Sequence, residues 1–123
     1  MKKKILYYLI AFLFICCNNK DPYPPGINID TPEDGKHIYK GDVLNINFLI
    51  SDNDEIRSYS IKLSNETTQK EELVQTESVG LKQKRVQTSW TLNYYTKSTF
   101  TLHIEATDKK GNKAAQNLLL YGN

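Results

Sequence analysis

Hydrophobic and polar residues alternate along most of the chain from Ile27 onward, with the period of two that is typical of half-buried β-strands. The clearest runs place their apolar residues on one face: Leu44, Ile46, Phe48 and Ile50; Tyr59, Ile61 and Leu63; Val86, Trp90, Leu92 and Tyr94; Phe100, Leu102, Ile104 and Ala106. Shorter runs occur at 27–30, 37–39, 72–77 and 114–121. The pattern predicts an all-β fold of seven or eight short strands.

Turn-forming residues separate these runs at 32–35, 40–42, 51–54, 65–67 and 108–112. About seven short strands in roughly 100 residues is the arithmetic of an antiparallel β-sandwich, in which two sheets pack face to face. We therefore expect one domain over residues 27–123. The two cysteines, Cys16 and Cys17, are adjacent in sequence, so the domain is predicted to have no disulfide and to be stabilised by burial alone.

The first residues have the pattern of an export signal. Lysines at positions 2, 3 and 4 precede an apolar run over 5–15, a length that suits a signal peptide and is too short to span a bilayer. The residues that follow, Cys-Cys-Asn-Asn-Lys-Asp, are no basic stop-transfer flank. We expect residues 1–16 to be removed as a signal peptide.

Phe14-Ile15-Cys16-Cys17 resembles the lipobox of bacterial lipoproteins, in which a cysteine after a small residue is acylated and becomes the new N-terminus. The resemblance implies a lipid on Cys17, although Cys16 stays an alternative. It also implies a cell-envelope protein held on a membrane, the outer membrane of a Gram-negative bacterium, and Lys20-Asp21 is similar to short signals for the cell surface. The Pro-rich segment 17–26 is predicted to be an extended tether that holds the domain about 28 Å from the bilayer.

The run 106–112, Ala-Thr-Asp-Lys-Lys-Gly-Asn, resembles a turn near the end of many bacterial immunoglobulin-like domains. Gly41-Asp42, ahead of a long strand, is similar to the same group. The resemblance implies an immunoglobulin-like sandwich of the cadherin-like or fibronectin-like kind, because the inter-sheet cysteines of antibody domains are missing. The chain resembles the many small immunoglobulin-like lipoproteins of unknown function in Gram-negative envelopes, and we expect a monomeric, non-enzymatic interaction or spacer module.

Charge argues against a nucleic-acid partner. Three of the 16 Lys and Arg residues lie in the first four positions, so the chain from Cys17 onward has 13 basic and 14 acidic residues. Its one basic run, Lys82-Gln83-Lys84-Arg85, is short. The two histidines, His37 and His103, have no evident partner for metal binding or catalysis, so we expect no enzyme activity and no cofactor.

Acidic residues gather in two of the predicted turns. If the fold is an immunoglobulin-like sandwich, Asp52, Asp54 and Glu55 would face Asp108 at the end of the domain next to the tether. Oxygen ligands of this kind suit Ca²⁺, but Asp and Asn also favour turns by bonding to their own backbone. The sequence assigns no metal ligand and leaves open whether these four residues bind calcium.

Two other functions remain open from the sequence. Trp90, Tyr94 and Tyr95 would form a sugar-binding platform in a glycan-binding adhesin, although the alternation places Trp90 and Tyr94 in the core. An envelope inhibitor or chaperone would need an exposed edge strand that accepts another chain, and 72–77 is the run most typical of an edge. The expected partner is therefore an envelope protein or a glycan.

Overall fold

The computed structural model describes residues 21–94 and 96–123, which form six β-strands and contain no helix. The strands are β1 (Gly26–Thr31), β2 (Lys36–Ile38), β3 (Val43–Asn65), β4 (Lys70–Thr91), β5 (Ser98–Asp108) and β6 (Lys113–Gly122). No helix capable of crossing a membrane is found in these ranges. The all-β prediction is confirmed, while the predicted signal peptide and Cys17 lie outside the described residues.

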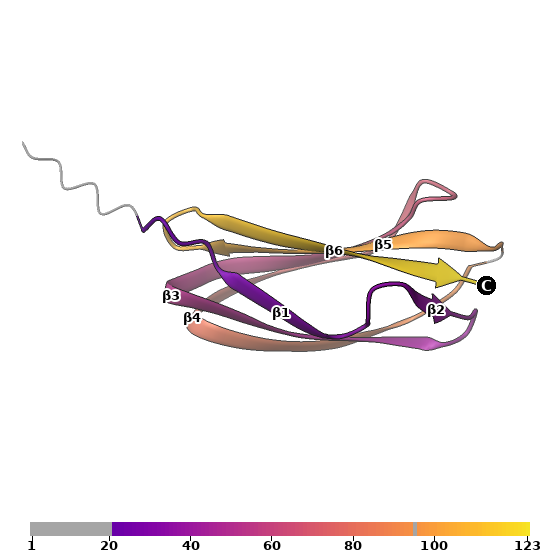
Figure 1. Ribbon diagram of the computed structural model, residues 1–123, viewed down its shortest axis with the longest axis horizontal. Helices are drawn as coiled ribbons and strands as arrows, with labels where there is room; N and C mark the ends of the chain where they lie inside the picture. The colour runs from indigo at the N-terminus through magenta and orange to yellow at the C-terminus, as the bar shows by residue number, and fades with distance from the viewer. Residues whose placement is uncertain (1–20, 95) are drawn as a thin grey trace, which may run out of the picture.

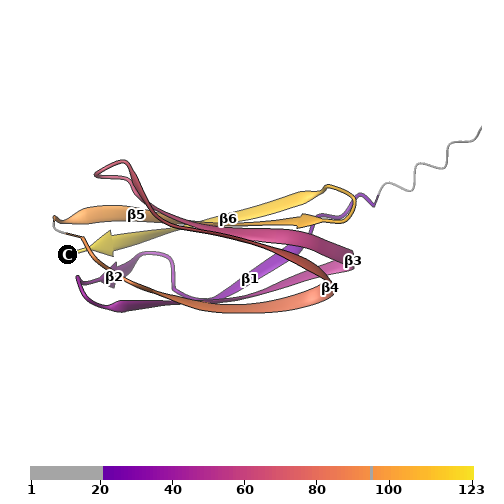
Figure 2. The same ribbon diagram turned by 180° about the vertical axis from the view of Figure 1, so that it is seen from behind.

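The strands form one curled sheet (Figure 1) in the order β1-β3-β5-β6-β2, with β4 paired to β3. Residues 43–51 of β3 pair with β1 and with residues 83–91 of β4. Residues 56–65 of β3 pair instead with β5 and with residues 70–81 of β4. Because β3 and β4 turn back together, the two halves of the sheet face each other, as Figure 2 shows from behind.

The strand count corrects the prediction of seven or eight strands. The predicted turn at 51–54 lies inside β3, where the register shifts between Ser51 and Ile56 but the strand continues. Irregularities of this kind bend a strand without ending its hydrogen bonding. The predicted runs 43–50 and 58–64 therefore form one strand. The run 72–77 likewise shares β4 with the start of the next run, which leaves the strand after Thr91. The sheet is also not wholly antiparallel, since β2 and β6 run parallel.

The core lies between the facing halves of the sheet and follows the predicted alternation. Every apolar residue singled out in the first, second and fourth runs is buried, and so are Val86, Leu92 and Tyr94 of the third. Trp90 is partly buried and packs against this core. Alternate side chains of a strand point to opposite faces, so one apolar face per strand is enough to close the interior.

The molecule is elongated and its two ends are built differently. At the end that we call the C-terminal end, β2 and the last residues of β6 lie beside Tyr94. At the opposite, N-terminal end, residues 21–25 meet the bend of β3 and the turn between β5 and β6 (Figures 1 and 2). The acidic residues of interest lie at the N-terminal end.

Candidate functional site

Three aspartates from three segments meet at the N-terminal end. Asp21 precedes β1, Asp52 lies at the bend of β3, and Asp108 is the last residue of β5. One carboxylate oxygen of each lies within 4.8 Å of the others. Among the residues that the structure describes, this acidic cluster is the only group of three or more carboxylate, histidine or cysteine side chains close enough to share a metal ion.

Asp108 anchors the acidic cluster and is fully buried. Its Oδ1 accepts hydrogen bonds from the backbone N–H of Lys110 at 2.9 Å and of Asn112 at 2.8 Å, and its Oδ2 accepts one from Asn112 Nδ2 at 2.8 Å. Burial raises the pKa of Asp108, but the hydrogen bonds from Asn112, Lys110 and Gly111 outweigh burial and bring that pKa below its ordinary value. Asp108 is therefore a carboxylate at neutral pH.

Asp21 and Asp52 are each satisfied on one oxygen only. Asp21 Oδ1 accepts hydrogen bonds from the backbone N–H of Tyr23 at 3.0 Å and from Asn53 Nδ2 at 3.2 Å. Asp52 Oδ2 accepts one from the backbone N–H of Asp54 at 3.0 Å. The other oxygens, Asp21 Oδ2 and Asp52 Oδ1, have essentially no accessible surface and no hydrogen-bond partner in the described chain. A buried carboxylate oxygen without a partner is costly and calls for a ligand or ion.

Asn112 joins the N-terminal segment to the turn between β5 and β6. Its Nδ2 donates to Asp108 Oδ2 and also, at 2.7 Å, to the backbone carbonyl of Asp21. The turn before it depends on Gly111, whose φ of +92° is strained for other residues. Asn112 therefore positions Asp21 relative to Asp108.

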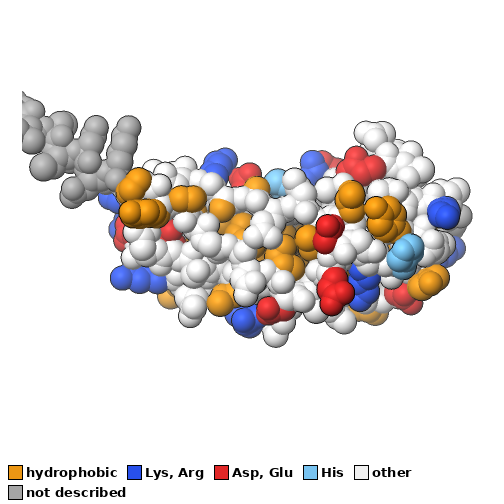
Figure 3. All heavy atoms as spheres, in the orientation of Figure 1, with side chains coloured by type: hydrophobic (Ala, Val, Ile, Leu, Met, Phe, Trp, Pro, Cys, Tyr) orange, Lys and Arg blue, Asp and Glu red, His pale blue; other side chains and the backbone are white. Residues whose placement is uncertain are grey.

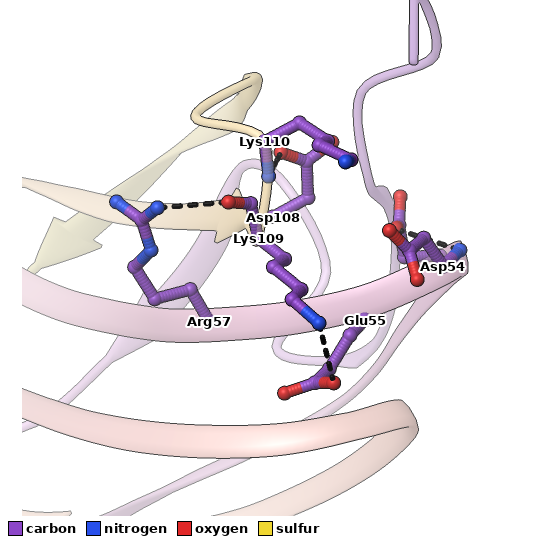
Figure 4. Close-up of polar contacts among 7 residues, drawn as sticks. Asp54, Glu55, Arg57, Asp108, Lys109 and Lys110 are labelled. Atoms are coloured by element: carbon purple, nitrogen blue, oxygen red, sulfur yellow. Dashed lines mark hydrogen bonds and ion pairs between the residues drawn. The ribbon is translucent and has the colours of Figure 1, made fainter. Parts of the chain in front are cut away.

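The structure changes the set of acidic residues that the sequence brought together. Asp52 and Asp108 meet as predicted, whereas the carboxylates of Asp54 and Glu55 lie outside the acidic cluster. Figure 4 shows the reason for Glu55, which turns toward Lys109 and lies 3.8 Å from its Nζ. Asp54 contributes only its backbone N–H. Asp21 takes their place, although the sequence offered it only as part of a sorting signal.

The histidines and most of the aromatic residues considered in the sequence analysis are engaged in structural contacts. His37 lies against Tyr121 with ring centroids 5.5 Å apart, and His103 contacts the side-chain oxygen of Asn117. Of the three rings in the predicted sugar platform, Tyr94 is buried, Trp90 packs on the core, and Tyr95 lies outside the described residues.

The surface also carries an unpaired strand edge. β4 pairs with β3 and with no other strand of the described chain, which confirms the prediction of an edge at 72–77. Val74 and Leu81 on β4 are exposed. Arg85, from the basic run, forms an ion pair with Asp30, and on the face in Figure 3 basic and acidic side chains are interspersed.

Comparison with known proteins places the chain in a family without assigning it an activity. Residues 15–118 match a family described as a domain of unknown function, DUF4625. No curated protein matches the chain. The matched segment begins two residues before Cys17, ends within β6 and contains all three members of the acidic cluster. Since the match spans well over half of the sequence, the protein belongs to the DUF4625 family.

Proposed function

We propose that the protein is a lipid-anchored lipoprotein of the cell envelope whose β domain is a non-enzymatic interaction or spacer module. Three lysines, an apolar run and a cysteine pair support export and acylation of Cys17. The membrane would be the outer membrane of a Gram-negative bacterium. Two or more acyl chains on one residue would give durable anchoring.

The observation that carries this proposal is the attachment of the N-terminal segment to one end of a long domain. Asp21 is held by Asn53 and Asn112, and Pro25 is buried. Four residues lead from Cys17 to Asp21, a span of at most about 14 Å. A lipid on Cys17 would therefore keep the N-terminal end near the bilayer, closer than the predicted 28 Å, with the C-terminal end pointing outward.

The curled sheet supports the finer assignment of an immunoglobulin-like sandwich. In that fold one layer contains strands A, B, E and D and the other contains C, F and G. Here β1 pairs with residues 43–51 of β3, which pair with residues 83–91 of β4. Residues 56–65 of β3 pair with β5, which pairs with β6. Dividing β3 and β4 at their bends gives counterparts of A, B and E in one group and of C, F and G in the other. Residues 70–81 of β4 pair with the second group and not with the first, where strand D would lie.

Mass spectrometry of the protein purified from membranes tests the anchor. We expect the mature chain to begin at Cys17 with acyl chains attached. Cys17→Ala should leave the precursor unprocessed, whereas Cys16→Ala, a matched change one residue earlier, should be processed and lipidated normally. A native chain that keeps Met1 and an unmodified Cys17 would contradict the proposal, and lipid on Cys16 would move the anchor by one residue.

A second candidate function is an envelope inhibitor or chaperone that accepts an extended segment of another protein along β4. The 22 residues of β4 pair on one side only, and the opposite edge exposes backbone groups that can pair with an added strand. The charged residues along β4 also suit an edge protected from pairing.

Photo-crosslinking in intact cells tests whether β4 accepts a strand from another protein or is an edge protected from such pairing. A photoreactive residue at position 74 should give an adduct with a partner protein if β4 accepts a strand. Position 43 is the matched control, because Val43 and Val74 are 56% and 61% exposed and only Val74 lies on β4. Equal adducts from both positions, or none from position 74, would leave the edge as a protected surface.

A further inference from the structure

We propose that Asp21, Asp52 and Asp108 bind one Ca²⁺ ion, which fastens the N-terminal segment to the end of the domain. The site uses only contacts within the described residues. The calcium site can therefore be tested independently of the lipidation of Cys17.

The first argument is electrostatic. Three carboxylates converge within 4.8 Å, and none of them takes part in an ion pair with another described residue. Lys109, which follows Asp108 in the turn, points its Nζ toward Glu55 (Figure 4). Like charges held this close repel each other, and the repulsion is stronger away from water. A bound cation would turn this repulsion into attraction.

The second argument is independent of charge and concerns the two orphaned oxygens. Asp21 Oδ2 and Asp52 Oδ1 are enclosed and accept no hydrogen bond from the described chain. Hydrogen-bond donors are nevertheless close, because the partner oxygen of each carboxylate is satisfied by a backbone N–H or an amide. The chain thus satisfies one side of each carboxylate and leaves the other side for a ligand that accepts electron pairs.

The ligand chemistry favours calcium. Ca²⁺ binds oxygen at about 2.3–2.6 Å, so two ligands of one ion can lie up to about 5 Å apart. The oxygens of the acidic cluster lie within 4.8 Å of one another, a spacing that one Ca²⁺ ion can bridge. Mg²⁺ demands near-ideal octahedral geometry at about 2.0–2.1 Å, dehydrates reluctantly and is usually bound through one or two carboxylates, whereas this cluster offers three. Zinc and copper favour histidine or cysteine, and the acidic cluster contains neither.

The ion would add a link between the N-terminal segment and the sheet. Asp52 and Asp108 belong to the sheet, whereas Asp21 lies five residues before β1. Among the described residues, the side-chain hydrogen bonds that hold Asp21 to the sheet come from Asn53 and Asn112. Calcium would therefore make the orientation of the domain relative to the segment before it depend on the surrounding ion concentration.

Calorimetric titration of the full chain, purified in detergent and stripped with a chelator, tests this site with CaCl₂ and MgCl₂ as the probes. We expect one Ca²⁺ per chain with a dissociation constant of about 1 mM or tighter. Asp52→Asn should weaken binding about tenfold or more, because it removes one of three charged ligands. Asp54→Asn is the matched control: it makes the same change two residues away, outside the acidic cluster, and should leave the affinity within about twofold.

Asp21→Asn provides a variant that does not alter the sheet, because Asp21 lies outside every strand. Its calcium affinity should fall as for Asp52→Asn, which keeps the test decisive if Asp52→Asn folds poorly. Thermal melting in calcium and in chelator gives an independent readout, since an ion that binds only the native state raises Tm. No heat and no change in Tm at 10 mM calcium, or an equal loss from Asp54→Asn, would overturn the site. An equal affinity for Mg²⁺ would overturn the assignment to calcium.

Discussion

The two ends of the domain close the same core in opposite ways. At the C-terminal end, Tyr94 packs edge-on against Phe100 with ring centroids 5.3 Å apart, and its hydroxyl lies 2.9 Å from the carbonyl oxygen of Ile38. Gly122 lies so close that an added Cβ would come within 2.8 Å of Phe100. At the N-terminal end, three carboxylates meet and two of their oxygens have no partner in the described chain.

This difference separates a structural end from a candidate functional one. Buried polar groups in native proteins are nearly always paired, and the C-terminal end follows that rule with groups of the chain itself. The N-terminal end departs from this rule at two atoms of the acidic cluster, Asp21 Oδ2 and Asp52 Oδ1. Burial and packing account for the aromatic end, whereas the acidic end is complete only with a partner that the chain does not supply. Calcium should therefore affect one end and leave the other unchanged.

The largest expected effect lies at the C-terminal end. Phe100→Ala removes a ring that is 1% exposed and should lower the free energy of unfolding by about 3–5 kcal/mol, through lost burial and the cavity that remains. Urea unfolding measured with calcium and with chelator should give the same difference in both. A loss that changes with calcium would show that the two ends are coupled through the core.

Tyr59, on the stretch of β3 between the two ends, provides a pH-dependent reference. Burial, together with the hydrogen bond that its hydroxyl donates to Glu77, raises the pKa of Tyr59 from 10.0 to about 12. The native state favours the neutral phenol, so this contribution is present in full below pH 10 and is lost as pH rises to about 12. The loss amounts to about 3 kcal/mol for a shift of two units. Urea unfolding between pH 8 and pH 12 measures it.

Tyr59→Phe is the control for this pH profile. Without a titrating phenol at position 59, the variant should lose the steep decline above pH 10 and keep the edge-on packing against Phe48, whose ring centroid lies 5.8 Å away. Added calcium should shift neither profile. The same decline in both proteins would assign it to other groups.

Local alternation predicted the strands best where a strand buries one face. Leu44 to Ile50 and Phe100 to Ala106 follow the period of two without a break, and those apolar residues are buried. The turn predicted at 51–54 was wrong for a physical reason. Asp and Asn favour turns, but the same residues also suit a strand bulge, where the chain bends while its partner strands stay paired.

The acidic cluster could be predicted only in part. Asp52 and Asp108 were expected to meet because the sandwich topology brings the two turns to one end. Asp21 depends on a contact between residues 91 positions apart, the hydrogen bond from Asn112 to its carbonyl, and no local pattern encodes such a contact. Glu55 was misassigned because the sequence does not show that Lys109 binds its carboxylate.

Asn112→Ala should show how far the N-terminal end depends on hydrogen bonds rather than on an ion. The amide donates to Asp108 and to the carbonyl of Asp21, so its removal leaves both acceptors short of a partner and should cost about 1–3 kcal/mol. We expect a smaller loss in calcium than in chelator, measured by urea unfolding. Asn117→Ala, an exposed change on β6, should stay within about 0.5 kcal/mol. Equal effects of the two changes would argue against a bridging role.

The smallest expected effect is a change in stability whose sign depends on calcium, which we expect only at the N-terminal end. In chelator, Asp52→Asn should raise the free energy of unfolding by about 1 kcal/mol, because it removes one of three mutually repelling charges near the surface. In saturating calcium the same variant should be less stable than the wild type, since it has lost a ligand of the ion. Asp30→Asn is the control, because Asp30 already pairs with Arg85 and its loss should be slightly destabilising or neutral in both conditions. Thermal melting of the wild type and both variants, each in calcium and in chelator, measures the reversal. If Asp52→Asn is destabilising to the same extent with and without calcium, the buried oxygen is only a packing contact, and both ends of the domain are structural.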